Sequence, residues 1–280
     1  DCNLKFDLQN SHKQVKKSKL EMSQQAGGDH VDESNQQQQQ QQQPAAGRGG
    51  NHDFLMYMAR LGTLVFTVLY LFTSLPAWHT RALLAYGVAS ALKLHTRARE
   101  SGVTMNMDGM RRLLAEDNAH YLLFVLIFAM APAPVTLALV PVFLFALLHS
   151  TVYTRQLVTR QQLPVTDQVL RLTSYIDRNT RTILTLIALN EIFLMPAVIL
   201  MLFNGYGSIV TPFLYYKFLI LRYCSNRNPY NRTVFRDLRI RAEQFCLSPS
   251  CPQIGQSIIR GFIAFVLRFC PPEAPQNYVY

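Results

Sequence analysis

The sequence has few charged residues and few cysteines for its length. Of its 280 residues, 16% are charged and 49% are hydrophobic, whereas about a quarter of a typical soluble chain is charged. This composition excludes a wholly disordered chain. The five cysteines include no Cys-x-x-Cys pair, so we expect neither a zinc site nor a disulfide framework.

Sequence motifs that would mark an enzyme are also lacking. No Gly-x-Ser-x-Gly, His-Glu-x-x-His or P-loop pattern occurs, although each of these is needed to place a nucleophile, a metal or a phosphate. Glu116, Asp117 and His120 are close enough to share part of a helix face, but a metal site would need further ligands. We therefore expect a non-enzymatic protein with no catalytic residues, no cofactor and no metal.

Residues 1–53 differ in composition from the rest of the chain. They include the unbroken glutamine run Gln36–Gln43, and they carry six basic and seven acidic residues. Because such a segment has little to bury, we expect a disordered, glutamine-rich tail. Met22 reads like a natural start, which suggests that residues 1–21 are not native. The net charge of +10 for the whole chain therefore comes from the remaining part.

Three apolar blocks follow the tail, at residues 61–92, 121–148 and 183–221. Turn residues divide the first block near Pro76 and the third at Asn204-Gly-Tyr-Gly-Ser. The middle block has 28 residues without a charge, and as one helix it would be about 42 Å long, against a hydrocarbon core of about 30 Å. Prolines interrupt it, so it is either a kinked span or a hairpin that turns near residues 131–134.

The basic residues lie between and after these blocks. The net charge is +3 over residues 93–112, +3 over residues 149–182 and +4 over residues 222–247. Positively charged flanks remain on the cytosolic side of a membrane, and all three can do so only if each block enters and leaves by the same face. We therefore predict an all-α integral membrane protein built of helical hairpins.

In this prediction, residues 54–221 form the multi-spanning membrane domain and residues 222–280 form a basic cytosolic region. The sequence Asn231-Arg-Thr fits the glycosylation rule, but in the cytosol it should stay unmodified. The expected partner is the lipid bilayer, in particular its anionic cytosolic leaflet. Nucleic acid is not expected, because the basic residues flank apolar spans and are not set among exposed aromatic side chains.

Glu191 lies within the third block, where an ionisable side chain is costly and marks a candidate functional site. Folding this block about residue 206 brings Arg222 nearly level with Glu191, and Lys217 about one helical turn away. We predict an intramembrane ion pair formed by these three residues. The alternative is a proton or ion relay in a channel or transporter subunit that uses Glu191, although no second acid occurs in any span.

Residues 254–269 contain no acid, and their apolar and basic side chains separate on a helical wheel. This pattern predicts an amphipathic helix that lies in the bilayer surface. The alternative is a short helix packed on the rest of the protein. The residues expected to bind the membrane surface are Arg260, Phe262, Phe265, Arg268 and Phe269.

Short strings in and beside the blocks carry a further signal. They include Ser90-Ala-Leu-Lys-Leu-His95, His120-Tyr-Leu-Leu, Asn190-Glu-Ile-Phe-Leu-Met-Pro196 and Arg227-Asn-Pro-Tyr230. Together they closely resemble the transmembrane protein 33 family, from about Phe54 to Cys270. The glutamine-rich tail falls outside this resemblance.

The resemblance implies a multi-pass protein of the endoplasmic reticulum membrane and the nuclear envelope. Relatives are linked to organisation of the tubular reticulum, in opposition to reticulon-type shaping proteins, and to the distribution of nuclear pores. The implied partners are therefore reticulon-type proteins and nuclear pore components. A C-terminal amphipathic membrane-binding region is a feature of fungal relatives, and the family has no accepted catalytic residues to carry over.

Overall fold

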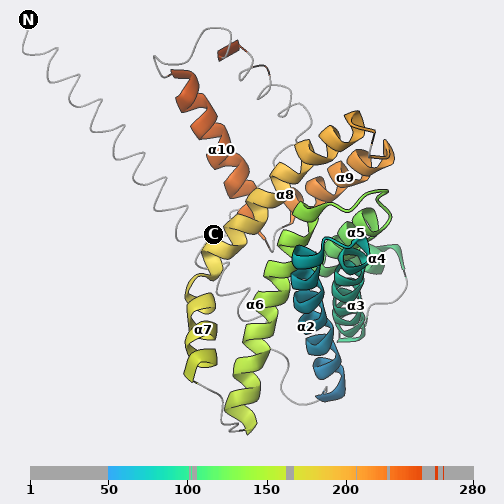
Figure 1. The fold of residues 1–280 in the computed structure, drawn as a ribbon, viewed down its shortest axis with the longest axis vertical. Coiled ribbons are helices and arrows are strands. Elements are labelled where there is room, and N and C mark those ends of the chain that lie inside the picture. The colour runs from blue at the N-terminus through green and yellow to red at the C-terminus, as the bar shows by residue number, and fades with distance from the viewer. Residues whose placement is uncertain are drawn as a thin grey trace, which may run out of the picture. The chain divides into compact units, whose positions relative to one another are not determined.

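The computed structural model of the chain describes residues 50–100, 106–161, 167–205, 207–225 and 228–247, with single positions at 102, 256, 257 and 261. All regular structure in these ranges is helical, which confirms the all-α prediction. The helices are α2 (Gly50–Thr73), α3 (Pro76–Glu100), α4 (Met107–Leu114), α5 (Asp117–Ala129), α6 (Thr136–Gln161), α7 (Asp167–Arg178), α8 (Thr180–Phe203), α9 (Val210–Cys224) and α10 (Tyr230–Leu247) (Figure 1).

Two predicted segments fall largely outside the described residues. They are the glutamine-rich tail and the amphipathic helix over residues 254–269. The predicted end of the tail at residue 53 needs correction, because α2 begins at Gly50. Asp53 lies in the first turn of this helix, where a carboxylate interacts favourably with the positive end of the helix dipole.

Helices α2 and α3 form the first hairpin. Ser74 follows α2 in a left-handed conformation with φ of 54°, and its N–H donates to the carbonyl oxygen of Tyr70 at 2.7 Å. This αL residue closes the helix end. Pro76 is then the first residue of α3, a position where the missing N–H of proline has no consequence.

Helices α5 and α6 form the second hairpin. Helix α5 ends at Ala129 and α6 begins at Thr136, so the middle apolar block folds back on itself and is not a single kinked span. Pro132 and Pro134 lie in the turn, where the loss of a backbone donor breaks no helix. The structure therefore decides between the two arrangements that the sequence allows.

Pro141 lies inside α6 and does not end it. A proline at this position cannot donate to the carbonyl oxygen of Leu137, four residues earlier. The side-chain amide of Asn190 in α8 donates to that oxygen at 3.0 Å. A neighbouring helix thus satisfies the acceptor that proline leaves open, as an apolar environment requires.

Helices α8 and α9 form the third hairpin, and its turn depends on glycine. Gly205 has φ of +77°, a conformation that residues with a side chain adopt only with strain. At Gly207 an added Cβ would lie 3.0 Å from the backbone nitrogen of Leu202. The chain therefore passes too close to the end of α8 for any larger residue.

The turns of the first two hairpins lie side by side. The hydroxyl of Tyr70 near the end of α2 is 3.0 Å from the hydroxyl of Thr136 at the start of α6. His79 Nε2, near the start of α3, is 3.2 Å from the carbonyl oxygen of Val135 in the second turn. The two hairpins therefore point in the same direction.

The third hairpin points the same way. Phe128 near the end of α5 packs on Tyr215 near the start of α9, with 5.5 Å between ring centroids. Asp117 at the start of α5 meets Arg222 near the end of α9, with 3.1 Å between Oδ1 and Nη1. Helices α5 and α9 are thus antiparallel, and all three turns lie at one end of the bundle.

The hairpin arms differ in length. Within the described residues, three helices are long and apolar enough to cross a membrane, at His52–Thr73, Thr136–Thr159 and Thr180–Phe203. Helices α5 and α9 have 13 and 15 residues, which correspond to about 20 and 22 Å, less than the hydrocarbon thickness of about 30 Å. The second and third hairpins therefore each pair one long arm with one short arm.

Helix α10 corrects the predicted domain boundary at residue 221. Helix α9 continues through Arg222 to Cys224, and α10 contacts both α8 and α9. Tyr230, Asn231 and Val234 of α10 are buried. The basic region that begins at residue 222 is therefore packed against the hairpins over its described part and is not a separate unit.

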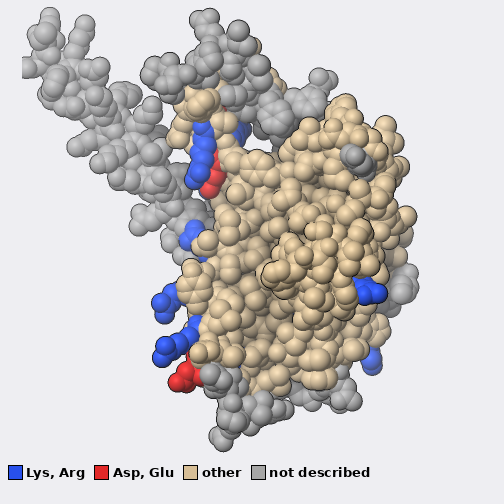
Figure 2. Space-filling model, viewed as in Figure 1, with Lys and Arg blue, Asp and Glu red and all other residues tan. Residues whose placement is uncertain are grey.

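Charged side chains are unevenly distributed on the surface. The face in Figure 2 is largely free of Lys, Arg, Asp and Glu over α2, α6, α8 and α9; most charged side chains in view lie near α7 and α10, and a few basic ones lie at the opposite edge. Helix α6 lies between α2 on one side and α7 and α8 on the other (Figure 1). The long apolar helices thus present an uncharged surface of the kind that a bilayer core accepts.

Replacing Gly207 with alanine should destabilise the third hairpin. Its Cβ would meet backbone atoms of Leu202 and Met201 at 3.0–3.2 Å, and overpacking of this kind costs about 1–3 kcal/mol. The matched control is Gly62→Ala in α2, where the nearest atom would be at 3.7 Å. Thermal unfolding of the purified protein in detergent measures both, and an equal midpoint for the two variants would contradict the close approach at Gly207.

Candidate functional site

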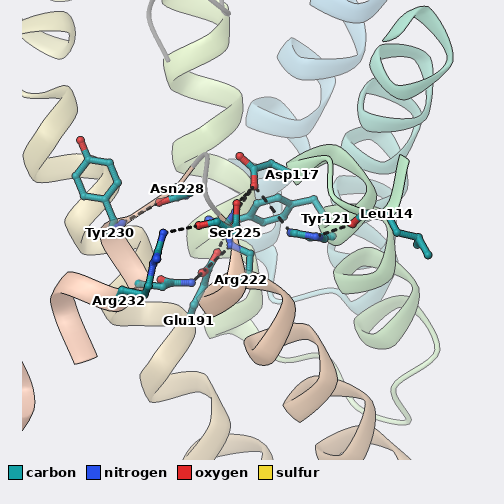
Figure 3. Close-up of polar contacts among 11 residues, drawn as sticks. Leu114, Asp117, Tyr121, Glu191, Arg222, Ser225, Asn228, Tyr230 and Arg232 are labelled. Carbon is teal, nitrogen blue, oxygen red and sulfur yellow. Dashed lines mark hydrogen bonds and ion pairs between the residues drawn. The ribbon is translucent and has the colours of Figure 1, made fainter. Parts of the chain in front are cut away.

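The candidate site is a buried polar network around Glu191, which lies in the middle of α8 and is 0% exposed. Figure 3 shows side chains of α5, α9 and α10 converging on it. The hydroxyl of Tyr121 in α5 donates to Oε1. Asn231 Nδ2 in α10 donates to Oε2 at 2.8 Å, and Arg222 Nε in α9 donates to the same oxygen at 3.2 Å.

Arg222 is the cation of this network and is 1% exposed. Besides Glu191, it binds Asp117, with Nη1 donating to Oδ1 at 3.1 Å. Its guanidinium carbon lies 5.1 Å from the ring centroid of Tyr121. Planar guanidinium groups can bond two carboxylates and stack on an aromatic ring together, so one side chain joins α9 to both α8 and α5.

Asp117 stands in the first turn of α5, where the helix dipole favours a carboxylate. Ser225, just after α9, donates its hydroxyl to Oδ1 of Asp117 at 3.1 Å. His120 lies one turn further along α5, and its Nε2 is 2.8 Å from the carbonyl oxygen of Leu114 at the end of α4. The start of α5 is thereby tied to both α4 and the end of α9 (Figure 3).

Asn231 is 0% exposed, and its side-chain nitrogen donates to Glu191. That nitrogen is the atom to which a glycan would be attached at the Asn-Arg-Thr sequence. A folded chain therefore cannot carry a glycan there, for a reason independent of which side of the membrane α10 occupies.

Aromatic side chains pack around the polar network. Tyr121 contacts the rings of Tyr86 in α3 and Phe145 in α6, with centroid distances of 5.7 and 4.9 Å. The hydroxyl of Tyr215 in α9 donates to the backbone carbonyl oxygen of Glu191 at 2.7 Å. This shell excludes water from the ion pair, and a low local dielectric strengthens each of its hydrogen bonds.

The arrangement is suited to holding helices together. Both carboxylate oxygens of Glu191 accept bonds from fixed donors, and these donors come from three other helices. A proton relay needs a group that can accept and release a proton toward a neighbouring acceptor. The described side chains that contact the carboxylate of Glu191 are donors, namely Tyr121, Arg222 and Asn231. The geometry favours a structural lock.

The predicted ion pair is found between two of its three residues. Glu191 and Arg222 are in contact, whereas Lys217 is exposed, with its ammonium 5.7 Å from the ring centroid of Phe213. The prediction for Lys217 is wrong because of helix rotation. The buried face of α9 contains Tyr215, Phe218 and Arg222, and a residue two positions from Tyr215 points away from it.

The membrane-surface residues predicted in the C-terminal segment lie outside the described residues. They are Arg260, Phe262, Phe265, Arg268 and Phe269. The metal site considered for Glu116, Asp117 and His120 is not formed: within the described part of the chain no group of three or more candidate ligands could hold a metal ion.

Sequence reasoning missed Tyr121, Asn231 and Ser225. Tyr121 and Asn231 lie in a family-like string and in a glycosylation sequence, and neither pattern points to Glu191. A weak signal did exist for Asp117, because it is an acid at the very edge of an uncharged block. An unpaired acid at that depth requires a cation, and Arg222 serves it.

Comparisons with known proteins agree on one family. A family model described as Transmembrane protein 33/Nucleoporin POM33 matches residues 35–272. Transmembrane protein 33 of Homo sapiens is 40% identical over 227 residues, which cover 78% of this chain and 90% of the relative. Krueppel homolog 2 of Drosophila melanogaster is 35% identical over 226 residues, or 80% of each chain. No solved structure matches the chain.

Replacing Arg222 with methionine should lower the free energy of unfolding by about 3–5 kcal/mol, because it leaves the carboxylate of Glu191 buried without a cation. Adding Glu191→Gln to this variant removes the unpaired charge, so the double variant should lose less than the sum of the two single losses. Denaturant unfolding of the purified protein in detergent measures the cycle.

The control for this cycle is Arg239→Met, which removes an exposed cation paired with Glu243 at 2.8 Å in α10. Exposed pairs contribute about 0–1 kcal/mol, so this variant should remain close to the parent protein. Equal losses for Arg222→Met and Arg239→Met, or strictly additive losses in the cycle, would show that the buried network does not hold the helices together.

Proposed function

Because the chain belongs to the transmembrane protein 33/nucleoporin POM33 family, we propose that this integral membrane protein organises curved membrane without catalysing a reaction. The proposed location is the endoplasmic reticulum membrane and the nuclear envelope, and the proposed role is the organisation of the tubular reticulum. The description of the family model names the nucleoporin POM33. This supports a second proposed role, in which the protein influences the distribution of nuclear pores.

The observation that carries this proposal is the shape of the hairpins. All three turns lie at one end of the bundle, and α5 and α9 are too short to cross a hydrocarbon core. At the opposite end, the base, α4 and α7 connect the hairpin arms, and α10 follows α9 and packs on α8. A protein with more mass at one end occupies more area in one leaflet and therefore favours a curved bilayer.

The charges support an orientation with the base toward the cytosol. The three positive regions flank the hairpins at their bases, opposite the turns. Positive flanks are retained on the cytosolic side. The wider end of the protein would then lie in the cytosolic leaflet, which is the convex leaflet of a reticulum tubule.

Helix α4 has the character of a helix that lies in a membrane surface. Met107, Met110 and Leu114 are more than half exposed, and they share one face of the helix. Arg112 lies on the other side, and Arg111 lies at the edge of the apolar face. This arrangement of apolar and basic faces is typical of interfacial helices, and α4 lies between the first and second hairpins.

Helix α7 repeats this pattern between the second and third hairpins. Ile176 is buried against the protein, whereas Leu172 and Tyr175 beside it are 57% and 66% exposed. Arg171 and Arg178 lie on the polar side. Both helices would add area to the cytosolic leaflet, and the predicted C-terminal helix would add more.

The proposed partners are the anionic lipids of that leaflet, reticulon-type proteins and nuclear pore components. The basic regions at the base suit anionic headgroups, each arginine near the surface contributing about 1 kcal/mol. The protein partners rest on the family resemblance alone. They would act at the same curved membranes and would meet this protein at its cytosolic base.

A channel or transporter subunit that uses Glu191 is the second candidate. The observation that favours it is a carboxylate at the centre of a spanning helix. Reconstituted ion flux that Glu191→Gln abolishes would establish this function. We expect no such flux, because Tyr121, Arg222 and Asn231 occupy the carboxylate.

The proposal predicts that the full chain concentrates on curved membrane. The labelled protein is reconstituted in giant vesicles with its basic base outward, and a narrow tube is pulled from each vesicle. The ratio of protein to lipid fluorescence should be higher in the tube than in the vesicle and should rise as the tube narrows. An equal ratio at all radii would contradict a role in organising curved membrane.

Two sets of variants locate the effect. Leu172→Glu with Tyr175→Glu should lower the enrichment in tubes, and Phe262→Glu with Phe265→Glu should do the same if the C-terminal helix contributes. Ser174→Glu is the control, because Ser174 is exposed on the polar side of α7. Loss of enrichment by Ser174→Glu as well would indicate that added charge alone is responsible.

A further inference from the structure

A second group of polar side chains lies between α2, α3 and α6, apart from the Glu191 network. We call it the α2/α3/α6 site. It contains two cations and two neutral polar side chains at one level of the bundle, and nothing in the proposed function uses it. Its residues are Arg60, Lys93, His149 and Ser150.

The packing of α2 on α6 brings Arg60 level with Ser150. The ring of Tyr57 in α2 stacks on Tyr153 in α6 at 4.8 Å, and its hydroxyl is 3.1 Å from that of Thr154. The two helices are antiparallel. One turn along α2 from Tyr57 is Arg60, and one turn back along α6 from Thr154 is Ser150.

Lys93 joins the site from α3. Its ammonium is 3.4 Å from Nε2 of His149, while Nδ1 of His149 is 2.8 Å from the carbonyl oxygen of Phe145. A ring whose Nδ1–H donates to that carbonyl has a free lone pair on Nε2, and Lys93 donates to it. The ammonium carries three N–H groups, so two remain for a further acceptor.

The two cations are not neutralised within the described part of the chain. Neither Arg60 nor Lys93 forms an ion pair with an acid there, and the charges of Arg60 and Arg97 repel that of Lys93. Asp53 attracts Arg60, and Asp117 and Glu116 attract Lys93, in each case without an ion pair to that cation. Two partly buried cations side by side are unfavourable unless an anion joins them.

Ser150 supplies a second sign of a missing ligand. Its residue is 5% exposed, and its hydroxyl has no hydrogen-bond partner among the described residues. Buried hydroxyl groups nearly always have a partner. Arginine, lysine and a serine hydroxyl together form a donor set that binds phosphate oxygens, and the contact with His149 holds the ammonium of Lys93 in place.

The surroundings favour a lipid over a free phosphate ion. Arg60 and His149 are each 14 residues from a hairpin turn, or about 21 Å, which places them toward the basic end of the bundle. Met58 and Val65 lie on the opposite side of α2 from Arg60 and are 39% and 55% exposed, so α2 has an apolar outer face as well as a cation. Acyl chains along this outer face would leave the headgroup at the cations, as in basic pockets that bind lipid headgroups between helices.

We propose that the α2/α3/α6 site binds the phosphate headgroup of an anionic phospholipid. The headgroup lies between the two cations and accepts bonds from both, and Ser150 donates to one of its oxygens. The chains lie along α2. The assignment of this lipid to the cytosolic leaflet rests on the proposed orientation of the protein, whereas the site itself does not.

The test measures thermal unfolding of the full chain in detergent with three separate additions. They are dioctanoyl phosphatidic acid, dioctanoyl phosphatidylcholine and inorganic phosphate. We expect a saturable rise of the unfolding midpoint with phosphatidic acid only. An equal rise with phosphatidylcholine would overturn the anion site, and an equal rise with inorganic phosphate would overturn its assignment to a lipid.

Variants then locate the binding. Arg60→Gln and Lys93→Gln should each raise the phosphatidic acid concentration at half-maximal effect about fivefold or more, since one cation near a headgroup contributes about that factor. Lys93→Arg should retain most of the affinity. The control is Arg155→Gln, which removes an equally charged but exposed side chain of α6 that pairs with Asp177. Equal effects of Arg60→Gln and Arg155→Gln would overturn the site.

A measurement without lipid separates binding from a structural role. Because the cations repel each other, Arg60→Gln should leave the unliganded protein as stable as the parent or more stable. A clear loss of stability without lipid would show that Arg60 already has its partner inside the protein. That result would overturn the proposal, whether or not the membrane-organising function holds.

Discussion

The carboxyl side chain of Glu191, buried in the middle of a long apolar helix, is the constraint on which the rest of the structure depends. A carboxylate in an apolar environment is strongly destabilising unless a cation and further donors surround it. Here these groups come from three other helices: Tyr121 from α5, Arg222 from α9 and Asn231 from α10. The second and third hairpins and the helix at their base are consequently one packed unit.

Neutral polar groups inside the bundle also need hydrogen-bond partners from other helices. Pro141 leaves a backbone oxygen of α6 open, and Asn190 of α8 donates to it. The first hairpin is attached through pairs such as Tyr70 with Thr136 and His79 with the carbonyl of Val135. In each case a polar group inside the bundle is satisfied by a different helix, because the bilayer core offers no water to do so.

The two groups of charged side chains in the bundle differ in how they are neutralised. Glu191 and Arg222 neutralise each other within the protein, whereas Arg60 and Lys93 do not have an acid at ion-pair distance in the described residues. The first pair therefore stabilises the fold, and the second suits an anion from outside. A protein that widens toward one leaflet and binds a headgroup there would couple its shape to the lipid that surrounds it.

The sequence by itself determined the helices and their turns, because these depend on local features. Prolines and the glycines after Asn204 located the turns of the first and third hairpins and limited the middle block to two arrangements, and the resemblance in the blocks identified the family. The sequence also placed Arg222 level with Glu191, because both residues belong to one hairpin whose turn is marked by Asn204 and the glycines after it. The position of Lys217 was wrong, because sequence separation places a residue along a helix more reliably than around it.

Only the tertiary structure decided how the hairpins meet. The sequence left the block over residues 121–148 open, since a proline either kinks a helix or ends it. The partners of Glu191 from α5 and α10 are 70 and 40 residues away, and no local pattern relates Tyr121 or Asn231 to it. Their convergence follows from which helix faces pack together, and that choice is made by the summed packing of the whole bundle.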